Sequence, residues 1–306
     1  MSKDLEAFIS AGEISNKILK EISRLVFEGQ GHLDTAETIE KMIIDAGAAP
    51  AFPTNISVNS LAAHATPSLN DEKVFQNDDL VKIDFGVSVD GCVSDQATTV
   101  DLSGKHTKQV ETAKKALTNA VNIMKEGVKV YDISKAIENT VISDGFRPIS
   151  NLGGHLIKPG LLHAGVFIPN VADSKDASSN YELREGDVFA IEPFVTSGKT
   201  GRVVDSEIVE IFSLKQIKNV RLNSSRKLMT HILKEYSTLP FARRWIQKSF
   251  NSTVTVNASL RELARNDILF QYPVLRDQDT ELVTQAEITV IVEKEGVKQL
   301  TPLDLI

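Results

Sequence analysis

The sequence predicts an α/β protein, in the broad sense that includes α+β folds, built from two related halves with an inserted helical segment. Three observations predict this fold class: an internal repeat in the first half of the chain, β-rich runs after each copy, and a helical stretch that interrupts the later strands. The chain has 306 residues, of which 42% are apolar, so it is long enough to bury a large core.

The repeat has a constant offset of 98 residues without gaps. In both copies a glycine turn is followed by an aspartate that we expect to cap a helix, then by the helix, a glycine and a proline. The aligned pairs include Glu28 with Glu126, Asp34 with Asp132, Gly47 with Gly145, and Pro50 with Pro148. The helices are expected over 34–46 and 132–144, each preceded by an amphipathic stretch, over 9–26 and 106–126. Matching caps and stops favour duplication over chance and predict an active site between two pseudo-symmetric halves.

The strand predictions start from a hairpin. Two β-rich runs, 80–89 and 91–102, are joined at Asp90-Gly91, which is a hairpin turn signal. Further strands are expected near 161–168, 187–195, 203–212 and 282–293. Residues 214–270 have helical periodicity and are predicted to form an inserted helical subdomain, closed by a short β-rich core at 251–257. The rest of residues 1–306 is expected to form one domain.

Composition excludes several classes of protein. The first 15 residues lack the basic and apolar regions of a secretory signal, and no run of about 18 apolar residues is present to span a membrane. The single cysteine, Cys92, can form neither an internal disulfide nor a thiolate metal site, and it is expected to be a packing residue. We therefore expect a cytoplasmic protein with no membrane contact, in which any metal is held by Asp, Glu and His.

Charge is unevenly distributed along the chain. The whole chain carries −7, whereas nine Lys and Arg residues against one Glu give residues 213–250 a charge of +8. This asymmetry predicts a surface that meets an anionic partner, and the alternative is a solvated helical face.

Two aspartates on the predicted hairpin suggest a metal site. If the residue numbers of facing positions sum to 179, Asp84 lies directly opposite Asp95. If they sum to 181, the two aspartates lie on a diagonal. Both registers place the carboxylates on one face, about 5 to 8 Å apart at Cβ. Two like charges on apolar strands resist burial unless a cation lies between them. The alternative is an exposed face with two ordinary carboxylates.

Three further residues favour the metal hypothesis. His155 follows a glycine pair, Glu192 ends an apolar run, and Glu287 lies in a β-branched segment where a carboxylate is rarely buried without a partner. Four carboxylates and one imidazole suit Mn²⁺, Fe²⁺, Co²⁺ or Zn²⁺, and four negative charges are too many for one divalent ion. The set therefore predicts two divalent metal ions about 3.5–4 Å apart. A bridging hydroxide would be the nucleophile, with Glu192 as both ligand and general base.

Seven motifs occur in a fixed order along nearly the whole chain. They are FPTNISVNSLAAHATP (52–67), KIDFGV with DGCVSDQATTV (82–100), NLGGH (151–155), LHAG (162–165), FAIEPF (189–194), LPFARRW (239–245) and YPVL (272–275). In these motifs the chain resembles the type 2 methionine aminopeptidases of the archaeal kind, which belong to peptidase family M24. The resemblance implies the pita-bread fold with a winged-helix-like insertion, and the start of the chain close to its first helix favours the archaeal kind.

The resemblance also implies a role for individual residues. The family's five metal ligands fall on the residues already suspected: Asp84, Asp95, His155, Glu192 and Glu287. Glu192 falls on the general base. His64 falls beside the substrate amide nitrogen, where it would stabilise the transition state or protonate the leaving amine, and His163 falls where it would bind the scissile carbonyl. The methionine pocket would be formed by Phe52, Leu162, Phe194 and Tyr272, which suit a thioether.

The implied reaction is hydrolytic removal of the initiator methionine from nascent proteins with a small second residue, by a monomeric metalloexopeptidase. The same rule predicts that the protein loses its own Met1, which Ser2 follows. One alternative is an X-Pro aminopeptidase or dipeptidase, which usually carries an additional N-terminal domain. Another is a non-catalytic relative that binds ribosomes or nucleic acid, which typically lacks metal ligands. The basic segment 213–250 is a candidate for docking on ribosomal RNA.

Two positions depart from the family pattern. Ile288 stands where the family usually has histidine, and it is expected to point away from the face of Glu287. Ala65 stands where the family often has an aromatic residue. Three histidines have no motif context and are expected at the surface: His32, His106 and His231.

Overall fold

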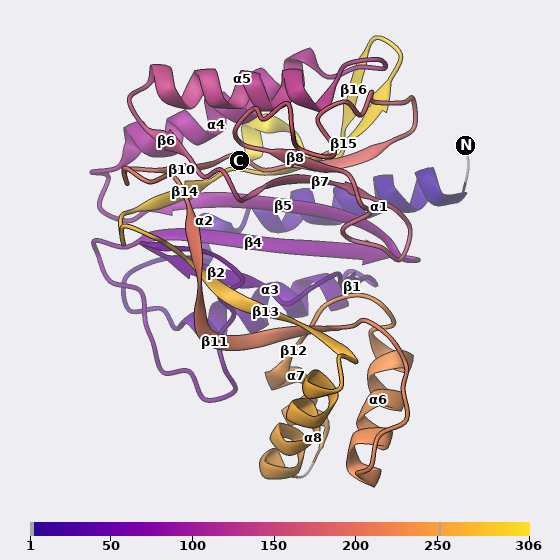
Figure 1. The fold of residues 1–306 in the computed structure, drawn as a ribbon. Coiled ribbons are helices and arrows are strands. Elements are labelled where there is room, and N and C mark those ends of the chain that lie inside the picture. The colour runs from indigo at the N-terminus through magenta and orange to yellow at the C-terminus, as the bar shows by residue number, and fades with distance from the viewer. Residues whose placement is uncertain (1–2, 251) are drawn as a thin grey trace.

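The two repeat copies fold into matching helices. In the computed structural model, which describes residues 3–250 and 252–306 (Figure 1), α3 (His32–Asp45) and α5 (Val130–Ser143) each have 14 residues and begin and end 98 positions apart. A two-residue strand follows each helix at the same offset, β1 (Ala49–Pro50) and β6 (Arg147–Pro148). The duplication inferred from the sequence is therefore present in the structure. Met1 and Ser2, where self-cleavage is predicted, lie outside the described residues.

The expected aspartate caps are wrong by three positions. The N-cap residues are Gly31 and Lys129, both in an extended conformation, so Asp34 and Asp132 lie in the first helical turn. A carboxylate there still stabilises the helix, because the unpaired N–H groups give this end a partial positive charge.

Among the described residues, the strands form four sheets. β4 (Leu80–Val89) pairs with β1, with β2 (Asn55–Val58) and with β5 (Cys92–Asp101). A second sheet has the order β16 (Gly296–Gln299), β15 (Ile288–Glu293), β9 (Val188–Ile191), β7 (Gly153–Ile157) and β8 (Phe167–Pro169). The third has the order β14 (Val283–Gln285), β10 (Phe194–Thr196) and β6. The fourth has the order β12 (Phe241–Ala242), β11 (Val203–Leu214), β13 (Leu269–Asp277) and β3 (Leu61–Ala63).

A second helix accompanies each repeat helix. The first half has α1 (Lys3–Leu19) with the short α2 (Ile22–Leu25), and the second half has α4 (Thr107–Ile123). α1 packs on β4 and β5, whereas α4 and α5 pack together above the strands in Figure 1. One hydrophobic cluster extends through both halves, with Ile39 of α3 and Ile137 of α5 among its fully buried members. A 3₁₀ helix, Leu303–Leu305, lies near the C-terminus.

The strand predictions are confirmed in part. The runs near 187–195, 203–212 and 282–293 contain strands, but in 161–168 only the last two residues do. The strands that were not predicted are β1, β2, β3, β6, β7, β12, β13 and β16. β7 escaped notice because its glycine pair resembles a turn. A Cβ on Gly153 would lie 2.1 Å from the Ile168 oxygen, and one on Gly154 would lie 2.3 Å from the Ala190 oxygen. These glycines therefore permit close packing of strands, which is a known use of glycine inside a sheet.

The predicted insertion contains three described helices between β11 and β13, at the bottom of Figure 1. They are α6 (Asn223–Glu235), α7 (Arg243–Ser249) and α8 (Thr253–Arg265). A separate hydrophobic cluster joins them to β11 and β13, with Ile232, Ile246 and Leu263 fully buried. The boundaries 214–270 and the winged-helix likeness remain predictions.

The β-rich core expected at 251–257 is wrong. Residue 251 lies outside the described residues, and 253–257 form the start of α8. The Ser252 side chain accepts a hydrogen bond from the Thr255 backbone N–H at 3.3 Å, which caps the helix. Packing of Val256 and Leu260 into the hydrophobic cluster overrides the β propensity of the Thr-Val-Thr-Val run.

No described helix is long and apolar enough to cross a bilayer. Cys92 is a buried packing residue, as expected. The three histidines expected at the surface are instead half-buried. Aromatic neighbours cover two of these rings: His32 packs on Phe75 with ring centroids 4.5 Å apart, and His231 packs on Phe250 with centroids 5.2 Å apart.

Candidate metal centre and substrate pocket

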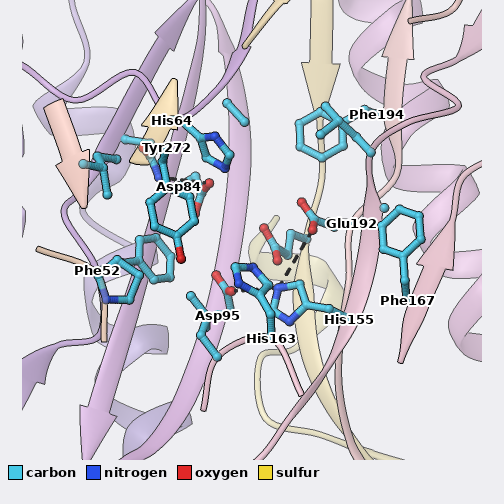
Figure 2. A pocket seen from close by; sticks show the side chains of 18 of the residues that line it. Phe52, His64, Asp84, Asp95, His155, His163, Phe167, Glu192, Phe194 and Tyr272 are labelled. Atoms are coloured by element: carbon cyan, nitrogen blue, oxygen red, sulfur yellow. Dashed lines mark hydrogen bonds and ion pairs between the residues drawn. The ribbon is translucent and has the colours of Figure 1, made fainter. Parts of the chain in front are cut away.

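The β4–β5 hairpin holds two of the suspected ligands. Asp90 and Gly91 have φ values of 49° and 83°, as a two-residue type I′ turn requires. Gly86 faces Asp95 and Asp84 faces Ala97, so facing residues sum to 181 and the diagonal arrangement holds. Both carboxylates point into the same cavity (Figure 2). Asn55, opposite Asp84 on β2, donates a hydrogen bond from Nδ2 to Asp84 Oδ2 at 3.3 Å.

A seam between the two halves brings Glu287 beside Asp95. Ala97 and Glu287 exchange backbone hydrogen bonds at 3.3 and 2.9 Å. On one side of this pair, Thr289 Oγ1 accepts from Asp95 N at 2.7 Å and donates to Asp95 O at 2.8 Å. On the other side, Thr99 Oγ1 accepts from Gln285 N at 2.9 Å and donates to Gln285 O at 2.7 Å. At both positions a threonine hydroxyl thus takes the place of the backbone N–H and C=O groups that a facing antiparallel strand would supply.

Glu287 lies between β14 and β15 rather than inside a strand, which corrects the sequence interpretation. The Glu287 backbone forms an isolated antiparallel bridge with Ala97 of the other half. It therefore lies outside the regular ladders of the two sheets that contain β14 and β15. Ile288 is fully buried in the hydrophobic cluster, away from the cavity, as expected from strand alternation.

The remaining two suspected ligands come from the second half. His155 lies on β7, and Glu192 directly follows β9. His155 Nε2 is 3.5 Å from Asp95 Oδ2 and 3.9 Å from Glu192 Oε1. One candidate ligand atom from each of Asp95, His155 and Glu287 lies within 4.8 Å of the others. Gln285 Nε2 donates to Glu192 Oε2 at 3.4 Å and to Glu287 Oε2 at 3.1 Å. The structure therefore brings all five residues together around one cavity of about 490 Å³.

The electrostatics of this cluster favour a bound cation. Burial, and then the neighbouring carboxylates, raise the pKa of Asp84, Glu192 and Glu287 well above the usual range. Burial raises the pKa of Asp95 to about 8 and lowers that of His155 to about 4. Among the described residues, Asp84 Oδ1 and Asp95 Oδ1 are buried without a hydrogen-bond partner. Such groups are costly unless a positive charge compensates them, and a neutral imidazole with carboxylate oxygens fits a divalent metal.

The suspected methionine pocket shares this cavity. Phe52, Leu162, Phe194 and Tyr272 all line it. Gly86 makes room for the Phe52 ring, because a Cβ at position 86 would lie 2.4 Å from Phe52 Cε1. The Tyr272 hydroxyl lies 3.2 Å from Ser213 Oγ. Aromatic side chains therefore line the cavity beside the carboxylate cluster, which suits an apolar substrate side chain.

Both suspected catalytic histidines also line the cavity (Figure 2). The His163 ring packs edge-on against His155 with centroids 4.4 Å apart. His64 has a left-handed backbone with φ of 62°, and its Nδ1 lies 3.2 Å from the Pro273 oxygen. Burial lowers the pKa of His64 to about 4 and that of His163 to about 3. Both rings are therefore neutral near pH 7.

Sequence reasoning missed several residues that line the cavity. They are Asn55, Ala63, Asn151, Leu152, Gly153, Phe167, Ile211, Pro240 and Phe270. Asn55 and Pro240 belong to motifs already noted, FPTNIS and LPFARRW, so their place in the sequence was the available signal. Phe167 and Phe270 have no such signal, because only the tertiary fold brings them to the cavity.

The fold and the site together define a metal-dependent hydrolase, with the candidate site between two α/β halves. The model of metallopeptidase family M24 matches residues 6–220. The methionine aminopeptidase of Thermococcus onnurineus is 43% identical over 291 residues, covering 95% of this chain and 97% of the relative. The methionine aminopeptidase of Pyrococcus horikoshii is also 43% identical, over 298 residues, covering 97% of this chain and 99% of the relative. The chain therefore belongs to metallopeptidase family M24, and both relatives are methionine aminopeptidases.

Solved structures support the fold. The methionine aminopeptidase of Thermotoga maritima has a TM-score of 0.71 at 22% identity and covers 98% of this chain and 97% of its own. A thermophilic Arx1 has a TM-score of 0.84 at 18% identity and covers 100% and 94%. The expected pita-bread fold is thereby confirmed, and the family assignment implies use of a divalent metal.

Proposed function

We propose that the protein removes the N-terminal methionine from nascent proteins with a small second residue, as a cytoplasmic monomer. The observation that supports this function is a single cavity that contains both the five-residue ligand set and an aromatic pocket. A free N-terminal methionine would place its amine and carbonyl at the ligand set and its side chain among Phe52, Leu162, Phe194 and Tyr272.

Asp84, Asp95, His155, Glu192 and Glu287 would hold the metal. Four carboxylates favour two divalent ions over one, and Mn²⁺, Fe²⁺, Co²⁺ and Zn²⁺ all suit the ligand set. When bound, these ions would polarise the scissile carbonyl and acidify a water molecule.

The protein's own groups would bind and move protons around the substrate. Glu192 would accept the proton of the attacking water and pass it to the leaving amine. His163, which is neutral, would donate a hydrogen bond to the carbonyl oxygen as negative charge develops there. If Nδ1–H of His64 donates to the Pro273 oxygen, its Nε2 is left as an acceptor. His64 Nε2 would then accept a hydrogen bond from the N–H of the scissile amide rather than protonate the leaving amine.

Peptide turnover tests the proposed function. The peptide Met-Ala-Ser should be hydrolysed with release of free methionine, whereas X-Pro peptides in which X is not methionine should be cleaved at least about 100-fold more slowly, since the aromatic pocket discriminates by the fit of the first side chain. Mass spectrometry of the products would identify the bond cleaved. Faster cleavage of X-Pro peptides would favour the dipeptidase alternative.

The threonine seam gives a second prediction. Thr289→Val keeps the shape of the side chain but removes both hydrogen bonds to the Asp95 backbone. Because groups that orient ligands contribute to metal affinity, we expect Mn²⁺ or Co²⁺ to bind about 10- to 100-fold more weakly. Calorimetric titration measures this loss. Thr284→Val is the matched control, since Thr284 is equally buried and, among the described residues, its hydroxyl bonds only to the Gln109 oxygen. Equal affinities in the two variants would contradict the role of the seam.

We also propose that the basic segment 213–250 contributes to ribosome contact, but through few residues. Six of its nine basic residues have acidic partners within 4.0 Å, for example Lys215 with Asp267 and Lys248 with Glu37. Among the described residues, the three without such a partner are Arg221, Arg226 and Lys227. Docking on RNA phosphates through these three predicts weak co-sedimentation with ribosomes that is lost as salt rises. Absent or salt-insensitive co-sedimentation would contradict it and leave a solvated face.

A further inference from the structure

Arg244 of α7 is fully buried, which is unusual for a charged side chain on a short helix of the insertion. Its guanidinium forms an ion pair with Glu40 of α3. It also donates to Thr66 Oγ1 at 2.6 Å and to the Pro67 oxygen at 3.1 Å. One side chain of the insertion thus joins the first repeat helix to the segment that follows His64.

Glu40 completes the connection. Its Oε1 accepts from the Thr54 backbone N–H at 3.1 Å, and its Oε2 accepts from Trp245 Nε1 at 2.8 Å. Thr66 Oγ1 donates to the Thr54 oxygen at 2.8 Å. Because Glu40 and Arg244 contact both ends of the segment 54–67, they fix its two ends relative to each other. We call this set of contacts the Glu40–Arg244 clamp.

His64 lies inside the clamped segment in a strained conformation. Its φ of 62° is uncommon for a residue with a side chain and persists only where the surroundings hold it. On one side, Ala63 pairs with Leu275 of β13. On the other side, the Ala65 oxygen accepts from Ile56 N at 2.6 Å, and the clamp binds the next two residues. The backbone on both sides of His64 is therefore held.

We propose that Arg244 and Glu40 are positioning residues that hold His64 at the scissile amide, so that the inserted helices contribute to turnover without touching substrate. This inference rests on the role of His64 in the proposed function. The buried pair gives the insertion a direct connection to the active site, through Thr66 two residues beyond His64.

Thr66→Val tests the clamp with little risk to folding. The variant keeps the side-chain shape but loses the acceptor for Arg244 and the donor to the Thr54 oxygen. We expect kcat for Met-Ala-Ser to fall about ten-fold with KM unchanged, because a shifted His64 weakens the transition state more than substrate binding. Mn²⁺ affinity should stay at the wild-type value. Thr301→Val is the matched control and should leave kcat unchanged, since Thr301 is buried and its Oγ1 has no partner among the described residues.

A double-mutant cycle with His64→Ala distinguishes positioning from general structural damage. If the clamp acts through His64, adding Thr66→Val to His64→Ala causes no further loss of kcat. Arg244→Lys should behave like Thr66→Val, because an ammonium cannot reproduce the fork of contacts to Glu40, Thr66 and Pro67.

The possible results are separable. Losses that multiply in the double variant, or a rise in KM without a fall in kcat, would overturn the clamp while leaving the proposed function intact. A wild-type kcat for His64→Ala would refute the role of His64 in the proposed function, and the positioning role would fall with it.

Discussion

Replacing Glu192 with alanine is expected to lower kcat for Met-Ala-Ser by at least about 10³-fold, because the change removes both a suspected ligand and the general base. The side chain lines the cavity and is 3.9 Å from His155 Nε2, so the loss falls at the centre of the proposed site. Steady-state turnover with saturating metal measures it. Unchanged turnover would contradict the mechanism.

The same position separates chemistry from folding. Glu192→Gln keeps the volume of the side chain and removes its charge, so it should be as inactive as the alanine variant. Its metal-free form should nevertheless melt at a higher temperature than the metal-free wild type near pH 8, because one of four mutually repelling buried carboxylates is gone. Thermal melting in the presence of a chelator tests this. A lower melting temperature would mean that Glu192 stabilises the metal-free fold.

The second large effect concerns pH and metal together. The suspected ligand carboxylates have raised pKa values in the folded protein, with Asp95 at about 8, so the metal-free folded state binds more protons than the unfolded state. The contribution of these carboxylates to the free energy of unfolding is fully present below about pH 4, their usual pKa in an unfolded chain. It is lost as the pH rises through about 8, the pKa of Asp95 in the folded protein. Metal ions require the deprotonated ligands, so their stabilising effect has the opposite dependence.

We therefore expect the metal-loaded and chelator-treated proteins to differ more in melting temperature at pH 8 than at pH 5.5. Differential scanning fluorimetry at both pH values, with and without Mn²⁺, measures the difference. A separation that is equal at both pH values, or larger at pH 5.5, would contradict the cluster's role as the metal site.

Local and periodic features of the fold were predictable from the sequence. The helix pairs followed from apolar spacing and from the repeated glycine and proline positions, and the hairpin followed from Asp90-Gly91. β7 was missed because its glycine pair resembles a turn, and the Ile168 and Ala190 oxygens that explain these glycines are distant in sequence. The helix at 253–257 was mistaken for a strand because its burial in the insertion core outweighs local propensity.

The candidate site was predictable as a list of residues but not as an arrangement. A carboxylate in an apolar strand costs free energy to bury unless a partner compensates its charge. Asp84, Asp95 and Glu287 could therefore each be identified from the sequence as a candidate ligand. The contacts that arrange them join residues about 190 positions apart, such as Thr289 with Asp95. Arg244 is a similar case, because nothing in its local sequence shows that it forms a buried ion pair with Glu40, 204 positions away. Hydrogen bonds of this range depend on the completed fold.

We propose that five side chains hold two divalent metal ions in one cavity: Asp84, Asp95, His155, Glu192 and Glu287. A crystal structure of the protein grown with Mn²⁺, with anomalous data collected for manganese, tests this proposal. Two anomalous peaks about 3.5–4 Å apart among these five side chains are the predicted result. Manganese bound elsewhere, or absent from this cavity at saturating concentration, would contradict the claim.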